Sequence, residues 1–166
     1  MKLSTYMAAV AASVVATGER TGRQMVLGID CSADGNADVG EYAVVANHVE
    51  NHGASLNGKT ADKSYIGEGD STLKVSTQRQ FDITGQLLRG DDFHDFINSH
   101  KIKYGTGATV QRPYVYFDPG TGEGEKGVVT IVVNKDGSAA AGDPADIDVR
   151  LSSVGVPEEY EYSAEE

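Results

Sequence analysis

The sequence predicts a mainly β protein, an antiparallel β-sandwich or open barrel with one α-helix on its flank. Short runs of β-branched and aromatic residues recur along the chain, as strands prefer. The 20 glycines stand singly between these runs and mark turns. Strands joined by such turns, with one short helical pattern among them, favour a sandwich or barrel. A length of 166 residues is typical of one domain that buries its own core.

Two strands and a turn are expected in the first third of the chain. Residues 24–29 form a short apolar run, and residues 42–49 form a second one. Residues 34–36, with the sequence Asp-Gly-Asn, lie between them and tolerate the left-handed backbone of a tight turn. The three segments together predict a hairpin.

Residues 50–71 are polar and contain several glycines. A loop of this length inside a compact domain is uncommon and tends to be functional or disordered. The residues alone leave two interpretations open: a projecting loop that docks on a neighbouring molecule, or a flexible insertion.

Residues 73–84 show the clearest strand pattern, because apolar and polar residues alternate along them. The face expected to be apolar carries Leu73, Val75, Thr77, Phe81 and Ile83. Arg79 interrupts this face, which indicates either a sheet edge or an ion pair.

A helix is expected to follow. Asp91 or Asp92 can accept hydrogen bonds from the free N–H groups of the first turn, and a carboxylate there favours the helix dipole. The apolar residues at helical spacing are Phe93, Phe96 and Ile97. The residues expected to point outward are His94, Asp95 and Asn98.

The last third is again β in character. Strands are predicted at 113–117, 127–133 and 147–152, and a turn-forming loop at 118–124. The acidic residues 158–166 contain no lysine or arginine, and we expect them to be solvated or pressed against a partner.

The chain is expected to divide into an N-terminal segment (1–22), a β domain (23–157) and an acidic C-terminal tail (158–166). Residues 2–16 resemble a secretory signal, because one lysine precedes an apolar stretch and small residues. The stretch is mostly alanine and too short to span a bilayer, so we expect an uncleaved segment.

The charge balance argues against nucleic-acid binding. The formal net charge is −11, and the 14 basic residues are dispersed and form no patch. Acidity by itself favours solubility. The single Cys31 cannot form an internal disulfide, and we expect a small buried side chain there.

One loop imitates a calcium-binding loop. Its oxygen ligands at the required spacing are Asp30, Ser32, Asp34, Asn36, Asp38 and Glu41. That motif needs a helix on each side, whereas strands are predicted here. We therefore expect a hairpin turn stabilised by Asp and Asn side chains.

Other candidate chemistry is weak. His48 and His52 have the spacing of zinc ligands on a helix, but a strand would not make them converge and no third ligand is evident. No nucleophile elbow or phosphate loop is present in the sequence. We expect no enzymatic activity, no catalytic residues, no metal and no cofactor.

Residues 61–157 resemble the tail tube (major tail) proteins of long-tailed phages and gene transfer agents. A polar loop at 61–64 leads into the alternating strand that ends at 79–85, and a short helix follows at 90–97. A hairpin opens at 113–118, and the segment 141–144 precedes the closing strand. The order and spacing of these features carry the resemblance.

The resemblance implies a structural subunit. Such proteins form hexameric rings whose inner strands close a shared barrel, and the rings stack through a long loop, here residues 50–71. The contact candidates on this loop are Asn57, Lys59, Asp62, Lys63 and Tyr65. The strands at 73–84 and 42–49 are expected to face the lumen, and lumen-facing side chains are expected to carry net negative charge, because a basic bore would hold DNA phosphates.

The implied partners are other copies of the chain and the tape-measure, tail-terminator and baseplate proteins. DNA would pass through the lumen without specific binding, and no membrane is involved. The implied location is the tail of a virion made in the host bacterial cytoplasm.

Two alternatives remain open. One is a tube subunit of a bacterial contractile injection or secretion system. The other is a secreted β-domain that binds calcium or carbohydrate, which the signal-like N-terminus and the Asp30 loop favour.

Overall fold

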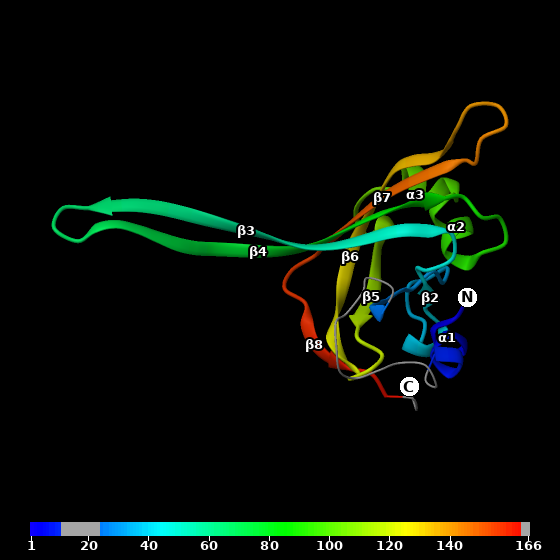
Figure 1. The fold of residues 1–166 in the computed structure, drawn as a ribbon, viewed down its shortest axis with the longest axis horizontal. Helices are drawn as coiled ribbons and strands as arrows, with labels where there is room; N and C mark the ends of the chain where they lie inside the picture. The colour runs from blue at the N-terminus through cyan, green and yellow to red at the C-terminus, as the bar shows by residue number, and fades with distance from the viewer. Residues whose placement is uncertain (11–23, 164–166) are drawn as a thin grey trace.

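The computed structural model describes residues 1–10 and 24–163. Figure 1 shows a compact body with helices at one end and a long two-stranded hairpin projecting from the other. The elements are α1 (Leu3–Val10), β1 (Val26–Ile29), η2 (Val39–Glu41), β2 (Ala43–Val44), β3 (Val49–Tyr65), β4 (Gly69–Gln86), α2 (Asp92–Ile97), α3 (His100–Tyr104), η3 (Gly107–Val110), β5 (Gln111–Phe117), β6 (Glu123–Ser138), β7 (Asp146–Ser153) and β8 (Glu158–Glu161).

The strands form one antiparallel sheet in the order β2-β1-β5-β6-β7-β4-β3, with β8 paired to β6 beside β7. The sheet curls around the helices and stays open, because β2 and β3 end it without pairing to each other. The predicted mainly antiparallel β fold with a flanking helix is confirmed, in its open-barrel form.

Two apolar clusters hold the body together. The larger one lies between the sheet and α2 and α3 and includes Phe81, Phe93 and Tyr114. The smaller one packs α1 against the other face of β1 and β5, with Leu3 and Phe117 fully buried. All four residues of β1 are therefore buried, which explains why its sequence is a continuous apolar run and not an alternating one.

Residues 50–71 form strand structure and not a long loop. They belong to β3 and β4, apart from the turn at 66–68, and the ladder pairs Val49 with Gly85 at one end and Tyr65 with Gly69 at the other. Hydrogen bonds between the two strands satisfy the backbone N–H and C=O groups, so the strands need no apolar side chains to form. The amino-acid composition indicates which residues are buried, but it does not indicate which backbone segments pair. The expected loop is thus a projecting hairpin.

The strand expected at 42–49 is shorter than predicted. It is reduced to Ala43–Val44, because residues 45–48 form a turn in which His48 has a φ of 54°. Gly85 allows this turn: a Cβ on it would lie 2.3 Å from the carbonyl oxygen of His48.

The predicted helix is present, and one outward residue was assigned wrongly. Asp91 caps α2 by accepting a hydrogen bond from the Phe93 N–H at 3.2 Å. His94 is fully buried, not exposed. Its Nδ1 accepts from the Leu88 N–H at 3.4 Å and its Nε2 donates to the Asn47 carbonyl at 2.7 Å, so two satisfied ring nitrogens make the burial possible.

Both chain ends pack on the body where they are described. Residues 3–10 form α1, and the rest of the predicted 1–22 segment lies outside the described residues. Glu158–Glu161 forms β8, and Tyr160 in it is buried, so this part of the acidic tail packs on its own chain. The domain boundaries themselves stay a prediction.

Candidate assembly interface

The outer part of the β3–β4 hairpin, which we call the arm (residues 56–79), has no second layer to pack on. β7 pairs with β4 only over Gln80–Gln86, so the arm leaves the sheet as an isolated two-stranded ribbon (Figure 1). Its large exposed apolar side chains are Leu56, Tyr65, Ile66, Leu73 and Val75, with exposed fractions from 49% to 109%. Several uncovered apolar side chains on one ribbon indicate an interaction surface.

The five predicted contact residues all lie on the β3 side of the arm and are exposed: Asn57, Lys59, Asp62, Lys63 and Tyr65. The Asn57 amide donates to Gln80 Oε1 at 2.9 Å, which ties the two strands of the ribbon together. Within the described residues, no ion pair involves Lys59 or Lys63. Their role in contacts between subunits stays a prediction.

A β-bulge splits the apolar face predicted for β4. The register shifts between Lys59 and Thr60, and Val75 opposite them has no partner in the ladder. A shift of one residue exchanges the faces beyond it. Leu73 therefore lies on the face opposite Val75 and Phe81, and its assignment to their face was wrong, since alternation alone does not reveal a bulge.

The two ends of the sheet differ: residues 1–3 cover the outer edge of β2 through hydrogen bonds with Tyr42 and Val44, whereas the outer edge of β3 is free in the described part of the chain. β2 has only two residues, whereas β3 is 17 residues long and pairs only with β4. A long edge with unpaired N–H and C=O groups is a template for a strand of another molecule. The fold therefore presents one long edge that a neighbouring copy can cover.

A groove of about 480 Å³ lies where the arm meets the body; we call it the arm-base groove. Its apolar lining combines Leu56 and Val75 from the arm with Val156 and Pro157 from the segment between β7 and β8. Val156 is 86% exposed, so the groove is open to a large partner. Lys74 also lines it.

An ion pair forms one wall of this groove and confirms one of the two predicted roles of Arg79. Arg79 binds Glu125 through two hydrogen bonds of 2.5 and 2.9 Å, and the Tyr114 hydroxyl donates to Glu125 at 3.0 Å. Burial alone would lower the pKa of Arg79, but the Glu125 carboxylate outweighs it and raises that pKa. Burial, and then the negative charge of Glu125, raises the pKa of Tyr114.

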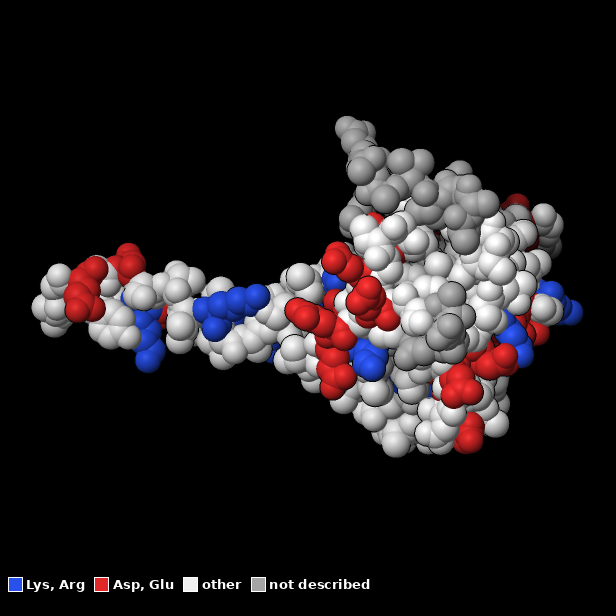
Figure 2. Space-filling model, turned by 90° about the horizontal axis from the view of Figure 1, so that it is seen from below, with Lys and Arg blue, Asp and Glu red and all other residues white. Residues whose placement is uncertain are grey.

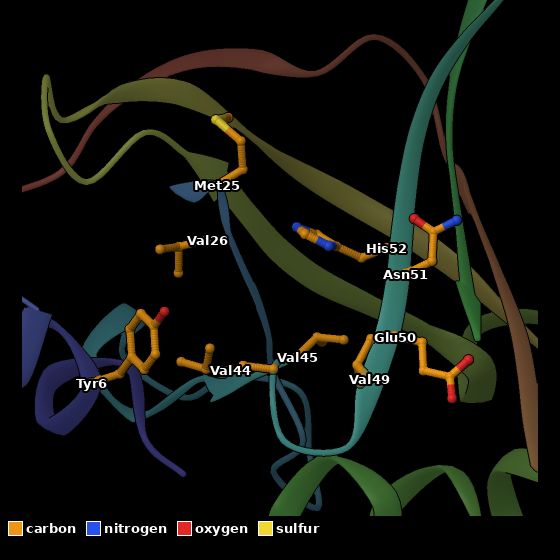
Figure 3. A pocket seen from close by; sticks show the side chains of 10 residues that line it. Tyr6, Met25, Val26, Val44, Val45, Val49, Glu50, Asn51 and His52 are labelled. Atoms are coloured by element: carbon orange, nitrogen blue, oxygen red, sulfur yellow. The ribbon is translucent and has the colours of Figure 1, made fainter. Parts of the chain in front are cut away.

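A second pocket of about 770 Å³ lies between the two ends of the sheet, lined by residues from α1, β1, β2 and β3 (Figure 3). His52 lies at this pocket, and its Nε2 is buried without a hydrogen-bond partner in the described residues. Burial lowers the pKa of His52, although a hydrogen bond with the Met25 backbone opposes the shift. The ring is therefore neutral near pH 7.

The first and last residues of the calcium-like loop make other contacts. Asp30 is fully buried and accepts hydrogen bonds from the Ser32 and Ala37 N–H groups at 2.8 and 3.0 Å, while Glu41 pairs with Lys2. His52 lies at the pocket between the sheet ends, at the start of the long hairpin. Across the described ranges, no group of three or more His, Cys, Asp or Glu residues could hold a metal ion.

The thiol of Cys31 is poorly suited to act as a nucleophile. Burial, and then the negative charge of Asp30, raises its pKa. The thiol form therefore dominates at neutral pH.

The acidic groups gather on the body close to the base of the arm, whereas the arm carries lysines along its length and acidic groups near its tip (Figure 2). In the β6–β8 ladder, Glu123 faces Glu161 and Glu125 faces Glu159. Like charges opposite each other in a sheet are unfavourable unless a cation joins them.

None of the helices in the described residues is long and apolar enough to cross a membrane.

No protein-family model matches the chain, and no curated protein matches it. Solved structures do. One is the tail of an empty gene transfer agent particle, refined helically with C6 symmetry; the match has 14% identity and a TM-score of 0.62, and covers 84% of this chain and 98% of that chain. Another is the virion of a native gene transfer agent particle, with 14% identity, a TM-score of 0.58, and coverage of 85% and 98%. The resemblance seen in the sequence is thus confirmed in the fold: the chain shares the fold of chains in gene transfer agent tails and virions.

Proposed function

We propose that this chain is a structural subunit of a phage-like tail tube, which assembles into hexameric rings that stack around a bore for DNA. One observation carries the proposal: an open sheet ends in β3, a 17-residue strand with a free edge, whose outer part belongs to an arm with uncovered apolar side chains. The shared fold with a gene transfer agent tail supports it, and the C6 symmetry of that tail suggests six copies in a ring.

Ring closure follows from the two ends of the sheet. The β3 edge of one copy pairs with an end strand of the next copy, so that six open sheets form one continuous barrel. Closure removes the exposed edge that a lone subunit presents. The pocket at His52 lies between the two ends of the sheet and changes its surroundings when they pair with neighbours.

The bore is lined by the polar face of β7 and of β4 over Gln80–Gln86; of the residues 73–84 expected to face the lumen, residues 73–79 belong to the arm instead. The opposite face of these strands is core, with Phe81, Ile83 and Leu151 fully buried. The charged residues on the polar face, with the neighbouring part of β6, are Asp82, Asp146, Asp148, Lys135 and Arg150. Three carboxylates against two cations leave a weakly negative surface, over which DNA phosphates slide and are not retained.

The arm reaches the adjacent ring. The lysines along it, Lys59, Lys63 and Lys74, join no ion pair within the described residues. Glu123 and Glu161, which face each other in the β6–β8 ladder, supply the complementary charge on another copy. The predicted contact residues thus lie where a neighbouring ring is met.

A subunit of this kind has no catalytic role. Its partners are further copies of itself and the tape-measure, tail-terminator and baseplate proteins, and its place is the tail of a virion made in the bacterial cytoplasm.

Light scattering after size exclusion, followed by negative-stain electron microscopy of the purified chain, tests the proposal. We expect species of six copies or multiples of six, and rings or tubes with a central hole. A chain that stays monomeric at all concentrations and leaves dispersed particles would contradict it.

A further inference from the structure

The tip of the arm presents an apolar knob. Ile66 has an exposed fraction of 109% and Tyr65 one of 49%, at a turn closed by a hydrogen bond from the Glu68 N–H to the Tyr65 carbonyl. Gly67 and Gly69 have φ values of +97° and +79°, which fixes the turn in a left-handed conformation. A large aliphatic side chain is thus held in solvent by a defined turn.

The arm-base groove has the complementary character. Leu56, Val75 and Val156 are exposed by 63%, 62% and 86%, and the Arg79–Glu125 pair beside them is already neutralised. An aliphatic side chain that enters the groove therefore removes apolar surface from water without removing water from an unpaired charged group.

One charge in the groove complements the charges at the tip. Glu68 and Asp70 stand beside Ile66 at the tip, and Lys74 lines the groove. Within the described residues, Lys74 joins no ion pair. An acidic tip entering the groove gives Lys74 a partner.

The knob cannot fill the groove of its own chain. Ile66 lies in the turn beyond the last pair of the ladder, Tyr65–Gly69, and Gly69 is six residues from Val75 along β4, which at about 3.3 Å per residue places tip and groove about 20 Å apart. Continuous strand pairing over this stretch keeps the ribbon extended. Knob and groove on separate parts of one chain form a heterologous contact, which propagates from copy to copy.

We propose that the Tyr65–Ile66 tip of one copy inserts into the arm-base groove of a second copy in the adjacent ring. This inference rests on the proposed tube function and names the contact that stacks the rings.

Disulfide cross-linking tests the contact in the assembled protein. In a Cys31→Ser background, Ile66→Cys is combined with Val156→Cys and the assembly is oxidised with copper phenanthroline. We expect a ladder of covalently linked copies on a denaturing gel. The matched controls are Ile66→Cys alone and Ile66→Cys with Val132→Cys, another exposed valine, on β6 outside the groove.

The controls separate this contact from the function on which it rests. If wild-type rings or tubes form but the Val156 pair cross-links no better than the Val132 pair, the contact is wrong and the tube function stands. If the wild-type chain forms neither rings nor tubes, both fall.

A second variant tests the knob without a new thiol. Ile66→Asp should weaken each tip contact by about tenfold to a hundredfold, because the buried isoleucine is lost, and should leave single rings in place of tubes. Ser71→Asp adds the same charge next to Lys63 and should keep tubes intact. Equal loss of stacking in both variants would overturn the role of Ile66.

Discussion

Single polar residues fix the root of the arm. Asp91 is buried and accepts hydrogen bonds from the Asn47 amide at 2.7 Å and from the Phe93 N–H. His94 holds the carbonyl of the same Asn47. The turn that starts β3 is thereby fastened to α2, and the direction of the arm depends on this network.

Asp91 should make stability depend on acid pH. Burial alone would raise the pKa of Asp91, but the Asn47 hydrogen bond, the N-terminal ammonium and the Phe93 N–H together outweigh it, and the pKa is lowered. A carboxyl group whose pKa is lowered by folding stabilises the folded state at pH values above its unfolded pKa of about 3.9. This contribution to the free energy of unfolding is lost as the pH falls through the folded pKa. Asp91→Asn should reduce the free energy of unfolding at pH 7 by about 1 kcal/mol.

The difference between wild type and Asp91→Asn should shrink below about pH 4, measured by urea unfolding at several pH values. A difference that stays constant down to the acid transition would contradict the ionised role of Asp91.

Cys31 should react slowly with thiol reagents in the folded chain. Its raised pKa leaves little thiolate at pH 8, and the reagent must also reach a largely covered sulfur. Ellman's reagent should label it at the normal rate only after unfolding in guanidinium. Rapid labelling of the folded protein would show that the thiol is exposed.

Among the elements, the arm depends on its ladder and on a close approach at its root. A Cβ at Gly85 would meet the backbone of the His48 turn, whereas one at Gly58 on the arm meets only the Lys74 side chain at 3.7 Å. Gly85→Ala should lower the free energy of unfolding by about 1–3 kcal/mol. Gly58→Ala, the same substitution in the same hairpin, should change it by less than about 1 kcal/mol, and similar losses in thermal melts of the two would refute the packing at Gly85.

The arm should contribute to assembly and little to folding. Replacing residues 59–76 with a two-residue Asn-Gly turn removes no residue of either core cluster. The melting temperature should stay within a few degrees of wild type by circular dichroism, while tubes disappear in electron micrographs. Loss of the folded state would mean that the arm supports the body.

The strands of the body could be predicted from the sequence. A strand buried on one face, such as β7, has alternating apolar and polar residues, and a strand buried on both faces, such as β1, is a continuous apolar run. The arm was expected in the right place but not as a strand. The two strands of the arm bury almost no side chains, so residues 50–71 show no apolar pattern that would indicate a strand. The bulge opposite Lys59 likewise changes the face of Leu73 without a trace in the alternation.

The molecule as a whole leaves several surfaces of its fold uncovered. Its sheet is open, its longest edge is free, and its arm carries apolar side chains that nothing in the described chain covers. The groove at the arm base could not be predicted from sequence, because the fold assembles it from segments around residues 56, 75, 125 and 156. Under the proposed function, other copies of the chain cover these surfaces.

A cryo-electron microscopy reconstruction of the assembled chain tests tube formation most directly. We predict sixfold rings with a shared barrel, the polar face of β4 and β7 toward a bore of net negative charge, and each arm reaching the adjacent ring. A solid filament, or a tube whose bore is lined by lysine and arginine, would contradict the proposed function.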